Sequence, residues 1–176
     1  HAKVIVFARA PVKGQVKTRL ASAVGDDRAL AIYCQLLDAV LQEMSGCGFH
    51  VCCYSDNPDN RYFDHWKQKG IGLYQQTGEG LGERMFNSLE AEKSDLAPVI
   101  MIGSDCPQLS CEIIHKVVDE LNGGKQVVIV PATDGGYVLI AFADKIYQQL
   151  FKDISWSTDI VMRQTKEKLS LLGLSF

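Results

Sequence analysis

Short apolar runs alternate along this sequence with segments in which apolar residues recur at helical spacing. The first run, Val4 to Ala8, is rich in β-branched residues, which is typical of a strand buried on both faces. Further runs predict strands over residues 49–54, 71–76, 97–105, 126–131 and 137–142. This alternation limits the chain to a few architectures, because each strand is followed by a segment able to cross back over the sheet.

The segments between the strands predict helices. From Asp26 to Gly46 apolar residues recur at helical spacing, with carboxylates at the start and glycine at the end. Further helices are expected over about 61–69, 81–89, 110–122, 144–151 and 157–169. Strands that alternate with helices pair in parallel through right-handed crossovers. We therefore expect an α/β fold, a three-layer sandwich with a mostly parallel central sheet, in a single domain of residues 1–176.

Charge and cysteine content restrict the function further. The formal net charge of -3 argues against bulk binding of nucleic acid or of an anionic membrane surface. No apolar run approaches the roughly 20 residues needed to span a bilayer. The six cysteines form no CxxC pair. We expect them to be reduced thiols of a cytoplasmic protein.

A cluster of cations follows the first predicted strand. Arg9, Lys13, Lys17 and Arg19 lie in the stretch FARAPVKGQVKTRLA, which contains no carboxylate. In a parallel sheet, ligands gather at the carboxyl ends of the strands, so this loop lies where phosphate groups are received. Gly14 and the proline before it can shape a turn with exposed backbone N–H groups, although a solvated basic surface loop is an equally open interpretation.

Two aspartates follow strands elsewhere in the sequence. Asp105 ends the most apolar strand, in GSDCPQL, and Asp134 precedes Gly135 and Gly136 ahead of the last strand. Taken singly, Asp105 could simply begin a turn and Asp134 could belong to a hairpin turn. Taken with the basic loop, they predict a site for a hard divalent cation, Mg²⁺ or Mn²⁺, together with phosphate oxygens.

Five stretches occur in an order that resembles a known bacterial family. They are FARAPVKGQVKTRLA, GEGLGERM, IGSDCPQL, DGGYVLIAF and ISWSTDIV, and they span residues 4 to about 162. This order resembles the DUF2064 group of glycosyltransferase-like proteins, of the radical-SAM/selenodomain-associated transferase 1 type. The resemblance implies the GT-A, or nucleotide-diphospho-sugar transferase, fold. Since that family usually continues with an acidic stretch beyond the position of Phe176, it also implies a truncated C-terminal end.

The resemblance implies a role for each matching position. The nucleotide phosphates would be bound by Arg9, Gly14, Lys17 and Arg19, and the base or ribose by Gly80, Leu81, Gly82 and Arg84. Asp105 would be a catalytic metal ligand and Asp134 a second acidic ligand near the acceptor. The acceptor or substrate would lie near Gly135, Gly136, Tyr137 and Trp156, although a tryptophan before a helix is also a common packing anchor.

Two departures from related enzymes keep several functions open. One glycine and a proline replace the GxG of pyrophosphorylases, and Ser104-Asp105 replaces the two-aspartate DxD of many glycosyltransferases. The expected function is a metal-dependent transferase with a nucleotide-diphosphate-sugar donor and an unidentified small-molecule acceptor. The alternatives are a nucleotidyltransferase that uses a nucleoside triphosphate and a non-catalytic nucleotide-binding domain. No general base can be assigned, and the oligomeric state stays open.

Overall fold

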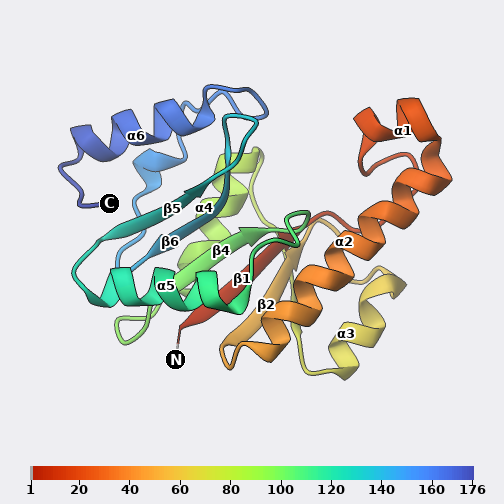
Figure 1. Ribbon diagram of the computed structural model, residues 1–176, viewed down its shortest axis with the longest axis horizontal. Coiled ribbons are helices and arrows are strands. Elements are labelled where there is room, and N and C mark those ends of the chain that lie inside the picture. The colour runs from red at the N-terminus through yellow and green to blue at the C-terminus, as the bar shows by residue number, and fades with distance from the viewer. Residues whose placement is uncertain (1) are drawn as a thin grey trace.

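The computed structural model describes residues 2–176 and has a central sheet with helices on both faces (Figure 1). The strands are β1 (Lys3–Ala8), β2 (His50–Ser55), β3 (Gly72–Gln75), β4 (Val99–Gly103), β5 (Val127–Pro131) and β6 (Tyr137–Phe142). The helices are α1 (Thr18–Val24), α2 (Asp26–Gly46), α3 (Asp64–Gln68), α4 (Leu81–Glu92), α5 (Cys111–Asn122) and α6 (Val161–Leu171). Short 3₁₀ turns cover Arg61–Phe63 and Gln148–Leu150. The predicted α/β class and mostly parallel sheet are confirmed.

The strand order in the sheet is β3-β2-β1-β4-β6-β5. The first four of these strands are parallel, and Val6 of β1 aligns with Cys53 on one side and Ile102 on the other. The prediction of parallel pairing is wrong for β6, which runs antiparallel to both β4 and β5. The physical reason is the short connection of residues 132–136, which allows a hairpin but not a crossover.

The sheet separates two apolar clusters. Val4 and Val6 of β1 pack with residues of α2 and α5 on one face, while Ile5 packs with residues of α4 and α6 on the other. Successive side chains of a strand point to opposite faces, so a strand of a covered sheet must be apolar throughout. This explains the continuous apolar runs of the sequence.

Three helical segments differ from the expectation. Helix α1 was not predicted, because it has only seven residues and none of them is buried. The last helix begins at Val161 rather than near Ser157, since Ser157 has a left-handed backbone with φ of 65°. Residues 144–151 form only the 3₁₀ turn at Gln148–Leu150.

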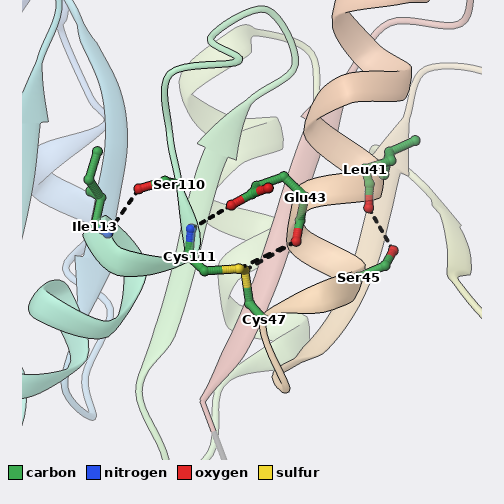
Figure 2. The surroundings of a disulfide bond; sticks show 7 residues. All are labelled: Leu41, Glu43, Ser45, Cys47, Ser110, Cys111 and Ile113. Carbon is green, nitrogen blue, oxygen red and sulfur yellow. Dashed lines mark hydrogen bonds between the residues drawn. A yellow bond between two sulfur atoms is a disulfide. The ribbon is translucent and has the colours of Figure 1, made fainter.

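The prediction of reduced thiols is wrong for two of the six cysteines. Cys47 and Cys111 form a disulfide, and the other four cysteines are free (Figure 2). Cys47 follows the last residue of α2 and Cys111 begins α5, and their Cα atoms lie 5.1 Å apart. The spacing of 64 residues gives no local signal of this contact, which exists only because the two helices lie side by side on the sheet.

Within the described chain, no helix is long and apolar enough to cross a membrane.

Candidate functional site

A cleft of about 1150 Å³ lies at the carboxyl ends of β1, β2 and β4. Seven of the predicted site residues line it, namely Arg9, Lys17, Arg19, Leu81, Arg84, Asp105 and Asp134. Arg9, Lys17 and Arg19 of the predicted basic cluster therefore share one cavity with both aspartates, whereas Lys13 does not line it and pairs with Asp27 at 2.7 Å. Gly14, Gly80, Gly82, Gly135, Gly136, Tyr137 and Trp156 do not form part of its wall.

The basic loop after β1 is held in a defined shape. The Arg9 guanidinium donates from Nη1 to the carbonyl of Gln15 at 2.9 Å, and Gly14 has φ of 77°, which only glycine adopts at little cost. Val16 is buried and anchors the end of the loop. Lys17 precedes α1 with a left-handed backbone, φ 50°, an uncommon state for a lysine. Such backbone strain is concentrated at functional sites.

Lys17 and Asp105 form an ion pair across the cleft. Lys17 Nζ lies 2.6 Å from Asp105 Oδ2, although 88 residues separate them in the sequence. The carboxylate is half exposed, and the lysine side chain is 27% exposed. Lys17 is thus the counter-ion of Asp105, and both side chains remain partly open to the cleft.

The remaining cations of the cleft differ in their partners. Arg9 Nε lies 3.4 Å from Asp56 Oδ2, and Arg84 Nε donates to the carbonyl of Gly78 at 2.9 Å. Arg19 lies in the first turn of α1, not in a loop as predicted, and is exposed without an ion-pair partner within residues 2–176. Arg19 is therefore free to bind an anion.

Asp56 is a cleft residue that the sequence interpretation missed. It follows β2, and its Oδ1 accepts a hydrogen bond from the backbone N–H of Ala10 at 2.6 Å. It therefore fixes the start of the basic loop. A signal was available, because Ser55-Asp56 follows an apolar strand just as Ser104-Asp105 does.

Tyr33, also missed, connects two loops of the cleft. Its hydroxyl accepts from the Arg9 N–H at 3.0 Å, donates to the Arg9 carbonyl at 2.8 Å and lies 3.3 Å from Ser104 Oγ. Burial raises the pKa of Tyr33 to about 12, so the phenol is neutral at physiological pH. It carries no sequence signal, because it occupies an ordinary inner position of α2.

The glycine-rich segment before α4 is placed by the buried side chain of Gln76. Gln76 Nε2 donates to the carbonyls of Ala8 and Tyr54, both at 2.9 Å. Leu81 and Arg84 then face the cleft. Gly82 has a packing role, since a side chain there would begin 2.2 Å from the carbonyl oxygen of Phe151. Gly80 is the exposed residue that precedes α4.

Asp134 lies in the turn of the β5–β6 hairpin. Its Oδ1 accepts from the N–H of Gly136 at 3.1 Å, as expected for a turn aspartate, and the residue also lines the cleft. Gly135 is required by packing, because a side chain there would overlap the carbonyl of Asp159. The hairpin interpretation is therefore confirmed, and the same turn brings a carboxylate to the cleft.

Tyr137 and Trp156 line a smaller hollow beside the cleft. Their rings meet edge to face with centroids 6.4 Å apart, and the partly buried Trp156 packs against the core cluster that covers one face of the sheet. Trp156 therefore packs against the core and also lines the hollow.

The acidic groups of the cleft suit a cation shared with a substrate. Apart from Glu43, Cys47 and Cys111, whose cysteines are bonded to each other, no three His, Cys or carboxylate groups of the described chain converge closely enough to hold a metal. Asp105 and Asp134 both line the cleft and could offer two carboxylates. Mg²⁺ is typically bound by one or two carboxylates and completed by water and phosphate oxygens, so these residues fit such an ion.

The chain is an α/β protein with the nucleotide-diphospho-sugar transferase fold. This class of protein is indicated by the strand order, by the basic loop after β1 and by the aspartate after β4. The chain belongs to the DUF2064 family, described as an uncharacterized protein conserved in bacteria, whose model matches residues 37–158. The family resemblance seen in the sequence is thereby confirmed. Among curated proteins, none matches this chain.

Solved structures support the same fold. The chain is 30% identical to a Desulfovibrio desulfuricans G20 protein provisionally described as a nucleotide-diphospho-sugar transferase, with a TM-score of 0.88 over 99% of this chain and 77% of that one. It is 14% identical to 4-diphosphocytidyl-2C-methyl-D-erythritol synthase from Anaerococcus prevotii DSM 20548, with a TM-score of 0.61 and coverage of 96% and 82%. It is 11% identical to a nucleotidyl transferase from Methanothermobacter, with a TM-score of 0.63 and coverage of 99% and 84%. The last two show the fold alone.

Proposed function

We propose that this protein is a metal-dependent transferase that uses a nucleotide-diphosphate-sugar donor. The observation that carries the proposal is the Lys17–Asp105 ion pair, which brings the predicted phosphate-binding cation and the predicted metal ligand together in one open cleft. The description of the Desulfovibrio relative supports the choice of donor. The proposed acceptor is a small molecule.

Each cleft residue has a part in binding and charge compensation. Arg19, which has no carboxylate partner in the described chain, and Lys17, once released from Asp105, would bind the two phosphates of the donor. Asp105 and Asp134 would hold Mg²⁺ or Mn²⁺, which when bound would offset the negative charge that develops on the leaving diphosphate. Arg84 and Leu81 would contact the ribose or base, on the side of the cleft formed by α4.

The transfer itself exchanges one bond for another. The acceptor oxygen forms a bond to the anomeric carbon, the bond from that carbon to the diphosphate breaks, and its electron pair leaves with the nucleoside diphosphate. The acceptor's proton is released to water. Positioned cations that compensate the departing charge are the main contribution of the chain to this step.

A nucleotidyltransferase is the second candidate, and the number of cations favours it. Arg9, Lys17, Arg19 and Arg84 all line the cleft, which suits a triphosphate, and a single aspartate stands where many glycosyltransferases have two. In that reaction pyrophosphate leaves a nucleoside triphosphate. Product analysis separates the two, because glycosyl transfer releases a nucleoside diphosphate instead.

Calorimetry with manganese tests the proposed site. UDP-glucose and GDP-mannose are titrated into the wild type, into Asp105→Asn and into the control Asp95→Asn, which alters an exposed carboxylate in the loop before β4. We expect manganese to strengthen binding of one donor in the wild type and the control, and Asp105→Asn to weaken it by about tenfold or more.

Equal heats for wild type and Asp105→Asn would contradict the role of Asp105. Tight nucleotide binding that is indifferent to manganese, with no turnover over a panel of donors and acceptors, would instead identify a non-catalytic nucleotide-binding domain.

A further inference from the structure

A carboxylate lies beside the disulfide that joins α2 to α5. Within the described chain, Glu43, Cys47 and Cys111 are the one group of three metal-ligating residues that converges, and their ligand atoms all lie within 4.8 Å of one another. Figure 2 shows the three side chains together where the two helices meet. None of them lines the cleft, so this group is separate from the proposed nucleotide site.

The two helices fix the positions of these three residues. Glu43 lies in the last turn of α2 and Cys47 follows it by four residues, so their side chains share one face of the helix. Cys111 is the first residue of α5, where a helix N-terminus favours a thiolate over a thiol. Glu43 Oε1 accepts from the Cys111 N–H at 2.9 Å, which holds the carboxylate toward the start of α5 (Figure 2).

The group is open to solvent and its carboxylate has no opposing cation. Glu43 is exposed and Cys111 is partly buried, whereas Cys47 is 7% exposed, so a reductant or an ion reaches the group from the side of Glu43 and Cys111. Glu43 forms no ion pair within residues 2–176. Its negative charge is therefore available to a metal ion.

Reduction converts the disulfide into two metal ligands. The S–S bond takes two electrons and two protons from a dithiol, which becomes a disulfide in its turn. A divalent cation then replaces the two thiol protons, which pass to water. Two thiolates at about 2.3 Å from a tetrahedral Zn²⁺ lie about 3.8 Å apart. Rotation about the Cα–Cβ bonds of Cys47 and Cys111, whose Cα atoms are 5.1 Å apart, can give this separation.

We propose that the reduced form of this group is a zinc site, in which the thiolates of Cys47 and Cys111 and the carboxylate of Glu43 bind Zn²⁺. Zinc accepts both thiolate sulfur and carboxylate oxygen, whereas Mg²⁺ takes oxygen ligands. Three protein ligands leave the fourth tetrahedral position to water. The link between α2 and α5 is thus covalent in the oxidised chain and passes through the metal in the reduced chain.

Cobalt titration of the reduced full chain tests the site. Co²⁺ takes the tetrahedral place of zinc, and thiolate ligands give it a charge-transfer absorption that oxygen ligands do not give. The chain is reduced with a phosphine under anaerobic conditions. We expect one Co²⁺ per reduced chain with this absorption, its displacement by one Zn²⁺, and no such absorption in the oxidised chain. Zinc should also protect Cys111 of the reduced chain from alkylation by iodoacetamide.

Variants identify the ligands. Cys47→Ser/Cys111→Ser should abolish the absorption, while Cys34→Ser, which removes a free thiol elsewhere on α2, should retain it. Competition with a chromophoric zinc chelator should show about tenfold or more weaker zinc binding in Glu43→Gln, since even a group behind a ligand contributes that much. Glu120→Gln, at an exposed position of α5, is the control and should bind zinc like the wild type. Thermal melts establish that each variant is folded.

Three results would overturn the proposal. The first is a reduced wild type without the thiolate absorption, or an absorption that survives in Cys47→Ser/Cys111→Ser. The second is equal zinc affinity of Glu43→Gln and Glu120→Gln, which would exclude the carboxylate as a ligand. The third is loss of the absorption in Asp105→Asn, which would place the metal in the cleft. An absorption unchanged in Asp105→Asn supports a separate site, whether or not the proposed transferase function is correct.

Discussion

The hydroxyl of Tyr33 shows how much one buried polar atom organises in this cleft. It contacts both the N–H and the carbonyl of Arg9 and lies within reach of Ser104, the residue before Asp105. The loops after β1 and β4, which carry the cations and the aspartate, are thus connected through a side chain from α2. Tyr33 is a positioning residue, because it acts on Arg9 and Asp105 through their backbone and neighbours.

Replacing Tyr33 by phenylalanine should loosen this connection. The Arg9 backbone loses a buried partner, so we expect the free energy of unfolding to fall by about 1 to 2 kcal/mol and nucleotide affinity to fall a few-fold. Urea denaturation and calorimetry measure the two effects. Tyr74→Phe is the control, since Tyr74 is exposed and donates no hydrogen bond within residues 2–176. Equal values for the two variants would show that Tyr33 fills space only.

At the scale of elements, the loop that carries Asp105 lies between a strand and a tethered helix. Asp105 follows β4, and six residues later the Cys111–Cys47 disulfide joins the start of α5 to the end of α2 (Figure 2). The Glu43 carboxylate also accepts from the Cys111 N–H at 2.9 Å, and Ser110 Oγ accepts from the N–H of Ile113. Both ends of this loop are therefore anchored.

Removal of the disulfide should lower stability without unfolding the protein. For a closed loop of this length the chain-entropy model gives about 4 kcal/mol, and measured values are typically about 2 to 4 kcal/mol. We expect a loss in this range for the double variant Cys47→Ser/Cys111→Ser in urea denaturation. Dithiothreitol should lower the stability of the wild type but not that of the double variant.

Thiol titration checks the bond directly. In denaturant without reductant, the wild type should show four reactive thiols, and six after reduction. Six thiols before reduction would contradict the disulfide.

At the scale of the whole molecule, buried groups that stay protonated determine the response to alkaline pH. Burial raises the pKa of Cys53 from its ordinary 9.0 to about 12 and that of Tyr33 from 10.0 to about 12. Burial also raises the pKa values of Tyr54 and Tyr62, whose hydroxyls additionally donate to Glu92 and Asp38. All four groups keep their protons in the folded state at pH values where the unfolded chain releases them.

The free energy of unfolding should therefore decrease as pH rises. Below about pH 9 both states are protonated and these groups contribute no pH dependence. Above pH 9 the unfolded state loses the Cys53 proton, and above pH 10 it loses the tyrosine protons. Each proton that only the unfolded state has lost lowers the free energy of unfolding by up to about 1.4 kcal/mol per pH unit. Urea denaturation between pH 8 and pH 11 measures the slope, which should be smaller in Tyr33→Phe. A stability that stays constant to pH 11 would contradict the burial of these groups.

The sequence by itself determined the strands and the edge of the sheet where the site lies. Each strand was predicted because a strand of a sheet covered on both faces must be continuously apolar, and Asp105 was placed at the edge because it directly follows such a run. The exposed helix α1 could not be found in this way, since it buries none of its residues. The antiparallel β6 could have been found, because the Asp134-Gly135 turn was a recognised hairpin signal.

Only the tertiary structure decided which residues meet in the cleft. The ion pair of Lys17 with Asp105, the contacts of Tyr33 and the disulfide join positions separated by 88, 24 and 64 residues. Such contacts depend on the order of the strands in the sheet and on the direction of each side chain. The local spacing of apolar residues indicates which side chains are buried, but it does not indicate which residues they contact. The sequence therefore indicated the kinds of groups in the site, and the fold determined which of them pair.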